Sequence, residues 1–279
     1  MSTRITDPAD PRLDAYLRLT DMDLRQAREP AEGIFIAEGE KVIRRALDSG
    51  CEMRSMLLEE KWLPTLADVV AATAAPVYLT DRKVLDATTG YAVHRGALAV
   101  MSRPAPRPAE SLLEGSTRLL LLEDVNDHTN VGLMVRSAGA LGMDAVLLSP
   151  ACADPLYRRA VKISMGASLT VPWARFGTWP GGLDQLTTAG VTVLALTPGP
   201  AATDLRALHV QPDDRVAVLV GSEGAGLRTS TLRRVPQHVR IPMGPGVDSL
   251  NVAAAAAIAM YAVGPGRRQG QQPGAQSRR

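Results

Sequence analysis

The sequence predicts an α/β protein of two parts, each a sheet with helices packed on it. Apolar runs of strand length alternate with helix-length patterns along most of the chain, which is typical of βα units and a parallel sheet. A proline-rich segment interrupts this alternation. The chain of 279 residues is also longer than one average domain of roughly 100–200 residues. We therefore expect two domains with separate cores.

Residues 1–103 are predicted to form a small α/β domain. Ile34–Ala37 is an apolar run of strand length, and Glu40–Leu47 repeats apolar residues with the period of a helix. Further strands are expected at Arg54–Leu58, Val77–Leu79 and Ala97–Met101. Three prolines at alternate positions follow in Arg103–Ser116, and proline cannot continue a helix or a central strand. We therefore expect residues 104–116 to be a stiff, extended linker.

Residues 117–264 are predicted to form a larger domain with a parallel sheet covered by helices. Arg118–Leu122 is almost continuously apolar, as expected for a parallel strand buried on both faces. Further strands are expected at Ala145–Leu148, Val191–Leu196 and Val216–Val220, and helices near Val131–Leu141, Leu156–Ile163, Gly226–Arg233 and Leu250–Val263. Ligands of such sheets bind outside the carboxyl ends of the strands. Residues 265–279 lack apolar anchors and are expected to be a disordered basic tail.

Composition excludes several classes of protein. The two cysteines, Cys51 and Cys152, have neither a disulfide framework nor metal-ligand spacing, so no metal is expected. The first residues have no apolar core like that of a signal peptide, and the longest uncharged apolar stretch is shorter than the roughly 20 residues of a membrane helix. Aromatic residues make up 4%, which disfavours a surface that stacks single-stranded bases. We expect a cytoplasmic protein without a membrane partner.

The net charge of +2 hides an uneven distribution. Residues 1–150 hold 17 Lys and Arg against 22 Asp and Glu, a balance of −5, whereas residues 151–279 hold 14 against 7, a balance of +7. This asymmetry favours an anionic partner. Of the 31 basic residues 27 are Arg, whose planar fork suits phosphate, although an Ala- and Arg-rich genome would leave the same excess.

Two polar motifs directly follow predicted strands. The first contains Asn130, a residue suited to capping a helix, and Arg136, which lies between one and two helical turns further on. A capped helix with one solvated arginine would have the same sequence. The second is Gly221-Ser222-Glu223-Gly224-Ala225-Gly226-Leu227, whose glycines let the backbone approach a ligand closely or form a tight turn. Its spacing is not that of a dinucleotide-binding fingerprint.

A third motif runs from Ile241-Pro242-Met243 to Ser249-Leu250-Asn251-Val252. Proline cannot donate to a sheet ladder, so this stretch is expected to be an edge strand or a loop. Ser249 or Asn251 could cap the helix that follows. That helix is apolar on all sides and is therefore expected to be buried, in the core or at a subunit interface.

Together, in this order and spacing, the motifs resemble those of the SpoU (TrmH-type) RNA 2′-O-ribose methyltransferase family of the SPOUT superfamily. The matching residues are Asn130-x-Gly132-x-x-x-Arg136, Gly221-x-Glu223-Gly224-x-Gly226-Leu227, Ile241-Pro242-Met243 and Ser249-Leu250-Asn251-Val252. The first domain resembles, with a weaker match, the family's L30e-like RNA-binding extension. The residues that carry this second resemblance are Phe35-Ile36-Ala37-Glu38-Gly39-Glu40-Lys41-Val42 and His94-Arg95-Gly96.

The resemblance implies a fold, a cofactor and partners. It implies a SPOUT-type parallel sheet with a C-terminal trefoil knot, and a homodimer in which the partner completes each site. It also implies methyl transfer from S-adenosylmethionine to a ribose 2′-hydroxyl of structured RNA. Ribosomal RNA is favoured, because the extension resembles those of rRNA-modifying members. Transfer RNA is one alternative, and an inactive RNA-binding or ribosome-assembly protein is another, against which the retained motif residues argue.

The resemblance also assigns residues to roles. The backbone that is expected to hold the cofactor lies around Thr197, Gly221, Ile241, Met243 and Leu250. Arg136 is expected to fix a substrate phosphate and to stabilise the developing alkoxide, since a guanidinium does not normally act as a base. The residues expected to orient Arg136 and the ribose are Asn130, Glu223, Ser249 and Asn251.

Two positions depart from the family pattern. Ala253 stands where many members have serine, and Asp127-His128-Thr129 stands where many have Asp-Pro-Gly. His128 is either a general base or a polar turn residue. Separately, Arg158 and Lys162 fall on one face of a predicted helix beside Arg159, which indicates either RNA phosphate contacts or a solvated helix face.

Overall fold

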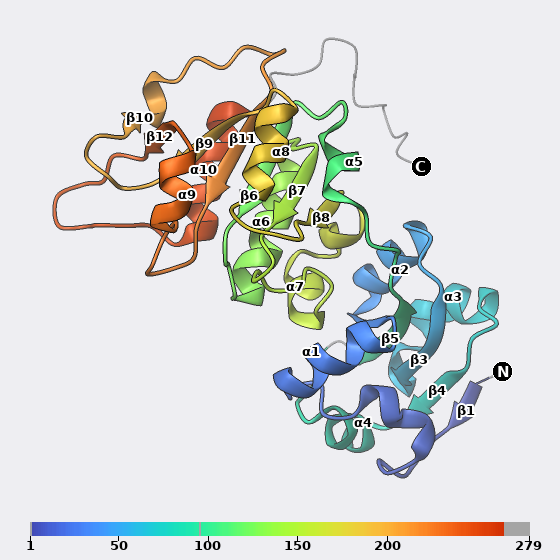
Figure 1. The fold of residues 1–279 in the computed structure, drawn as a ribbon. Helices are drawn as coiled ribbons and strands as arrows, with labels where there is room; N and C mark the ends of the chain where they lie inside the picture. Colours follow the sequence, from blue (N-terminus) through green and yellow to red (C-terminus); the bar gives the residue numbers. More distant parts are fainter. Residues whose placement is uncertain (1, 95, 265–279) are drawn as a thin grey trace, which may run out of the picture. The chain divides into compact units, whose positions relative to one another are not determined.

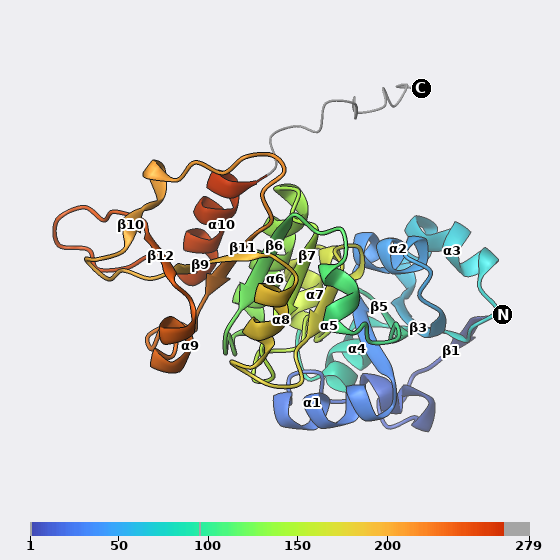
Figure 2. The ribbon, with the colours of Figure 1, turned by 45° about the horizontal axis from the view of Figure 1, so that its top comes forward.

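The computed structural model describes residues 2–94 and 96–264, which form two compact units (Figure 1, Figure 2). The first unit consists of the described residues up to Pro106 together with Asp127–Arg136 and Ala153–Thr170. The second consists of Arg107–Asn126, Ser137–Cys152 and the described residues from Val171 onward. This division differs from the predicted one, because two stretches beyond the predicted linker group with the residues of the first sheet. The predicted tail, 265–279, lies outside the described residues.

The first unit is built on a five-stranded mixed sheet. Its strands are β1 (Ser2–Arg4), β2 (Ile34–Glu38), β3 (Met53–Glu59), β4 (Val77–Thr80) and β5 (Ala97–Ser102). In the order β1-β4-β3-β5-β2, the first three are parallel, and β5 is antiparallel to both of its neighbours. Four of these strands match predicted ones. The sequence does not signal β1, because all three of its residues are exposed.

Short capping motifs begin and end the helices of the first unit. These helices are α1 (Met22–Ala31), α2 (Glu40–Asp48), α3 (Ala67–Ala72), α4 (Arg82–Thr89) and α7 (Arg158–Ile163). The Asp21 and Asp81 carboxylates accept hydrogen bonds from the first turns of α1 and α4. Gly90 ends α4 with a φ of 80°, a conformation that glycine adopts without strain. The predicted helix near residues 40–47 is confirmed as α2.

The second unit contains a seven-stranded sheet in which every pairing is parallel, so the predicted fold class is confirmed. Its strands are β6 (Arg118–Leu122), β7 (Ala145–Leu148), β8 (Trp173–Arg175), β9 (Thr192–Leu196), β10 (Thr203–Asp204), β11 (Val216–Val220) and β12 (Gln237–Arg240). They are ordered β10-β12-β9-β11-β6-β7-β8. The predicted strands occupy the centre, whereas β8, β10 and β12 are short and carry too few apolar residues to be recognised. The trefoil knot stays a prediction.

The predicted extended linker is wrong in its second half. Residues Ala109–Leu113 form helix α5, and Ala109, Leu112 and Leu113 are buried in the core of the second unit. The prolines restrict only the stretch up to Pro108, which immediately precedes the helix. The apolar residues that follow are free to form a turn of helix and to bury its face.

The remaining helices complete the second unit. They are α6 (His128–Ala140, grouped with the first unit up to Arg136), α8 (Gly182–Thr188), α9 (Thr229–Arg234) and α10 (Val252–Val263). Helix α10 packs on β11 near the middle of the sheet. Among the described residues, no helix is long and apolar enough to cross a membrane.

Candidate functional site

One pocket of about 420 Å³ in the second unit gathers most of the predicted site. It lies beyond the carboxyl ends of β9, β11 and β12, where parallel sheets bind their ligands. All five residues predicted to hold the cofactor line it, and so do three of the predicted orienting residues: Thr197, Gly221, Ile241, Met243, Leu250, Glu223, Ser249 and Asn251. Three motifs that are distant in sequence therefore share one cavity.

The glycine-rich motif forms a tight turn in the wall of this pocket. Ser222 and Gly226 pair across the turn, and Gly224 and Gly226 have φ values of 83° and 66°. Gly221 directly follows β11, at a point where a Cβ atom would lie 2.3 Å from the backbone carbon of Gly226. A tight turn and a close approach of the backbone to a ligand are the two alternatives for this motif. They are compatible, because the tight turn itself brings backbone to the pocket.

Asn251 joins the third motif to the second. Its Oδ1 accepts hydrogen bonds from the backbone nitrogens of Ala253 and Ala254 at 2.9 and 3.3 Å, so Asn251 caps α10. Its Nδ2 donates to Glu223 Oε1 at 2.5 Å. The cap fixes which way the amide points, and the amide in turn holds the Glu223 carboxylate at the pocket.

Asp127, and not Asn130, caps α6. Asp127 Oδ1 accepts from the Asn130 backbone nitrogen at 2.8 Å, which places Asn130 in the first helical turn. The prediction that Asn130 caps the helix is therefore wrong, because the acidic residue three positions earlier takes that role. Arg136 is exposed further along the same helix, and its guanidinium has no hydrogen-bond or ion-pair partner within residues 2–94 and 96–264.

His128 is buried within the first unit instead of facing solvent. Its ring packs against that of Tyr157 in a tilted arrangement with the centroids 4.1 Å apart, and its Nε2 lies 3.4 Å from the Gln26 amide nitrogen. Burial lowers the pKa of His128, and the carboxylates of Asp154 and Asp127 only partly oppose this effect. An enclosed, neutral ring favours a packing role over that of a general base.

This burial predicts a pH dependence of stability. In the unfolded chain His128 takes up a proton near the ordinary pKa of about 6.5, whereas the folded protein resists protonation until a lower pH. The free energy of unfolding should therefore decrease as the pH falls through this range, and less steeply in His128→Asn. Denaturant titrations of both proteins between about pH 5.5 and 7.5 check this, and equal slopes would contradict it.

Of the two alternatives for Arg158 and Lys162, the solvated helix face is wrong, whereas RNA phosphate contacts stay a prediction. Their side chains bind the carboxylate of Glu38 on β2, each with a nitrogen–oxygen distance of 2.5 Å. The Arg158 side chain is 11% exposed and lies over the Tyr91 ring. The sequence could not reveal this partner, which precedes Arg158 by 120 positions. Arg159 is exposed and stays a predicted phosphate contact.

Two acidic residues that have no role in the predicted site connect the end of β6 to Arg228, which directly follows the glycine-rich motif. Glu123, buried at the end of β6, accepts from the backbone nitrogen of Arg228 at 2.5 Å and from Trp179 Nε1 at 2.6 Å. Asp124 pairs with the Arg228 guanidinium at 2.5 Å and accepts from Ser149 at 2.8 Å. The sequence signal that could have identified these two residues is a pair of consecutive acidic residues directly after a buried strand.

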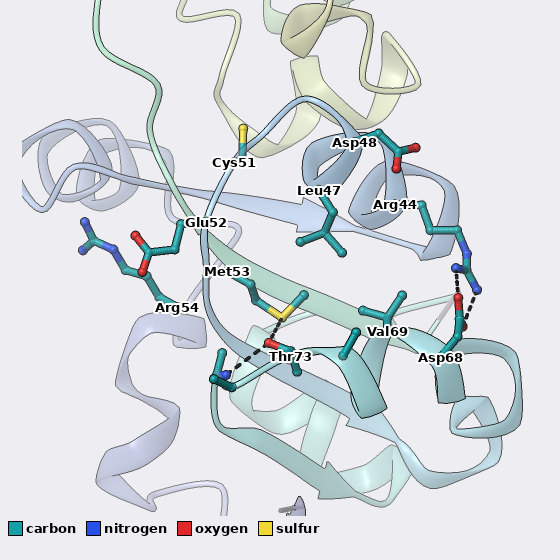
Figure 3. A pocket seen from close by; sticks show the side chains of 13 residues that line it. Arg44, Leu47, Asp48, Cys51, Glu52, Met53, Arg54, Asp68, Val69 and Thr73 are labelled. Atoms are coloured by element: carbon teal, nitrogen blue, oxygen red, sulfur yellow. Dashed lines mark hydrogen bonds and ion pairs between the residues drawn. The ribbon is translucent and has the colours of Figure 1, made fainter.

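A larger hollow, of about 1020 Å³, lies in the first unit among α2, α3 and the start of β3 (Figure 3). Leu47, Met53 and Val69 line it, and the ion pair of Arg44 with Asp68 lies at its edge. None of the predicted site residues borders it. It has neither a glycine-rich strand end nor a capped helix like that at Asn251, so its chemistry differs from that of the smaller pocket.

Comparison with known proteins identifies the family of this chain. The SpoU rRNA Methylase family matches residues 117–261. An uncharacterized tRNA/rRNA methyltransferase of Mycobacterium tuberculosis is 42% identical over 92% of this chain and 90% of its own. A 23S rRNA (guanosine-2′-O-)-methyltransferase, RlmB, of a Burkholderia species is 34% identical over 69% of this chain and 78% of its own.

A solved structure supports the fold of the whole chain. The AdoMet-bound rRNA methyltransferase of Sinorhizobium meliloti aligns with a TM-score of 0.81 over 97% of this chain and 99% of its own, at 24% identity. The family match covers all three motifs, and the Mycobacterium relative extends across both units. The chain therefore belongs to the SpoU rRNA methylase family.

Proposed function

We propose that this protein transfers a methyl group from S-adenosylmethionine to a ribose 2′-hydroxyl of ribosomal RNA. The observation that carries the proposal is the single pocket in which all five predicted cofactor residues meet Glu223, Ser249 and Asn251. The name of the Burkholderia relative supports ribosomal RNA and the 2′-oxygen, whereas that of the Mycobacterium relative leaves transfer RNA open. Ribosomal RNA also makes the cytoplasm the expected place of action.

The pocket fits the cofactor. Its volume of about 420 Å³ lies within the roughly 300–1,000 Å³ that small-molecule sites occupy. Ile241 and Leu250 offer apolar surface to a base, and the carboxylates of Glu223 and Asp248 suit a positively charged sulfonium. None of the described residues that line the pocket is basic. When bound, S-adenosylmethionine supplies an electrophilic methyl group.

The protein's own residues bind the cofactor, orient the ribose and stabilise the negative charge that develops during the reaction. The backbone of the glycine-rich turn and the capped Asn251 hold the pocket in shape before any ligand enters. Glu223, fixed by Asn251, and Ser249 orient the ribose, as the family pattern implies. Arg136 fixes a neighbouring phosphate and stabilises negative charge on the 2′-oxygen. Alignment of two reactants is worth several kcal/mol, so positioning can supply most of the acceleration.

Mapping of ribose methylation in total RNA, with and without the protein, tests the proposal. A single 2′-hydroxyl of ribosomal RNA should become methylated only in the presence of the active protein. A site in transfer RNA would establish the alternative substrate, and a new methylated base would overturn the reaction type. Calorimetric titration with S-adenosylmethionine adds a separate test, because a protein that does not bind it cannot be the enzyme proposed.

Replacing Gly221 with alanine should weaken cofactor binding by about tenfold or more. The added Cβ would meet backbone atoms of Gly226 and Leu227, which cannot rotate away as a side chain can. Gly244→Ala is the matched control, since a Cβ there meets nothing within 4 Å and the φ is not left-handed. Calorimetry on both variants measures the effect, and equal affinities would contradict the assignment.

We also propose that the protein is a homodimer and that α10 contributes to the interface. Ile258 and Tyr261, 44% and 80% exposed, continue an apolar stripe that begins at Ala254. Large exposed apolar side chains at helical spacing mark interaction surfaces. On the family resemblance, the first unit binds RNA with the help of Arg159, and the C-terminal segment is knotted.

Tyr261→Glu should shift the dimer to monomer. Burying a carboxylate without a partner costs more than a desolvated aromatic contact gains, so the dimer dissociation constant should rise by at least about tenfold. Met22→Glu, at a side chain 48% exposed in the first unit, is the control. Light scattering across a concentration series measures both, and a Tyr261→Glu protein as dimeric as the control would exclude this face.

A further inference from the structure

The catalytic helix α6 is in direct backbone contact with α7. A Cβ atom on Gly132 would lie 2.8 Å from the carbonyl oxygen of Ala160 and 3.1 Å from its Cα, so only glycine permits this approach. One turn earlier, the His128 ring packs against the ring of Tyr157, the residue before α7. These two contacts fix the part of α6 that carries Asn130 and leads to Arg136.

Helix α7 is in turn attached to the sheet of the first unit by one buried carboxylate. Glu38, whose side chain is 1% exposed, accepts from Arg158 and Lys162 at 2.5 Å each and from the Tyr91 hydroxyl at 2.9 Å. Arg158 also contacts the Tyr91 hydroxyl at 3.0 Å, with its guanidinium carbon 4.4 Å from the ring centroid. Two cations of α7 thus converge on a single group from β2.

A helix of six residues depends on such attachment. Isolated helices shorter than about 12 residues are marginal in water, so α7 owes its position to its tertiary contacts. Burial alone would raise the pKa of Glu38, but the hydrogen bond from Lys162 and the charges of Arg158 and Lys162 outweigh it and lower that pKa. The carboxylate is therefore ionised at neutral pH, as the attachment requires.

We infer that Glu38 is a positioning residue for methyl transfer, which holds α7 and through it the turns of α6 that carry Asn130 and Arg136. This inference rests on the proposed function for its catalytic consequence. It gives the first unit a task besides any binding of RNA, because a residue outside the stretch that matches the family sets the pose of the catalytic arginine. Glu38 itself touches no reacting atom.

Glu38→Gln tests the inference. The amide keeps the shape of the side chain but cannot neutralise two cations, one of which is nearly buried. Under single-turnover conditions with saturating RNA and cofactor, methyl transfer should slow by about tenfold or more. Affinities for RNA and for S-adenosylmethionine should be unchanged, and hydrogen exchange should accelerate in residues 128–136 and not in α10.

Asp68→Asn is the matched control. It makes the same carboxylate-to-amide change and also removes an ion pair with an arginine of the first unit, Arg44, at 2.6 Å. The rate of methyl transfer by Asp68→Asn and its hydrogen exchange at residues 128–136 should equal those of the wild-type protein. Should Glu38→Gln fail to fold, Lys162→Met removes one arm of the cluster at a side chain 41% exposed and should give a smaller effect of the same kind.

A double-mutant cycle with Arg158→Gln separates positioning from general destabilisation. Because the two residues act as one cluster, the double variant should be no slower than the slower single variant. Lower thermal stability with unchanged rate and unchanged exchange at 128–136 would overturn the inference. If the unchanged protein methylates no RNA, the proposed function fails, whereas the exchange measurement still decides whether Glu38 holds α6.

Discussion

Arg136→Ala is expected to lower kcat for RNA methylation by about 10²–10³-fold, the range found when one preorganised donor to a developing oxyanion is removed. The substitution should slow the reaction without disturbing the fold. Arg136 is exposed, and its guanidinium forms no hydrogen bond or ion pair within residues 2–94 and 96–264, so alanine leaves no buried group unpaired. Alanine also favours a helix, so the fold should persist.

The measurement is a single-turnover rate together with circular dichroism and cofactor titration. Arg206→Ala serves as the control, since Arg206 is 78% exposed and forms only a surface ion pair. Arg136→Lys separates charge from geometry, because lysine keeps the charge but loses the planar fork that grips phosphate in two places. Undiminished transfer by Arg136→Ala would refute the role assigned to it.

The parts of the site that the sequence could predict are those that depend on local backbone chemistry. The turn at Gly221–Leu227 needs glycine for steric reasons, and Asn251 caps the helix that follows it in sequence. Such local requirements produce a spacing of residues that can be recognised in the sequence. The strands β6, β7, β9 and β11 could be predicted for a similar reason, because strands buried on both faces are nearly all apolar.

The parts that could not be predicted depend on residues distant in sequence. Arg158 and Lys162 have the spacing of a solvated helix face, and only the fold brings Glu38 to them. In α5, apolar residues after Pro108 outweigh the extended character of the proline segment, since they find a core to enter. Helical spacing shows which side chains share a face, but not what that face contacts.

Arg118→Ala is expected to destabilise the second unit by about 3–5 kcal/mol, because it leaves several buried carbonyl groups without a donor. Arg118 begins the central strand β6 and is 1% exposed. Its guanidinium donates to the carbonyl oxygens of Val263, Asp214 and Gln211, the last at 2.7 Å. The positive charge of Arg118 at Val263 also interacts favourably with the negative, carboxyl-terminal end of the α10 dipole.

Denaturant unfolding monitored together with hydrogen exchange measures this effect. Exchange should accelerate first at the end of α10, where the Arg118 hydrogen bond to Val263 is lost. Arg118→Lys should recover only part of the loss, since an ammonium group keeps the charge but not the fork that reaches three carbonyls. Stability within about 0.5 kcal/mol of the unchanged protein, as for a typical surface substitution, would contradict the role of Arg118.

The same variant connects the core to the site. Helix α10 is attached at its end by Arg118 and is capped at its start by Asn251, which holds Glu223 at the pocket. Loosening the end of the helix should therefore weaken S-adenosylmethionine binding as the temperature approaches unfolding, while Arg206→Ala should not. Arg118 does not line the pocket. If the affinity for S-adenosylmethionine falls in step with faster hydrogen exchange in α10, the cofactor site therefore depends on this buried guanidinium.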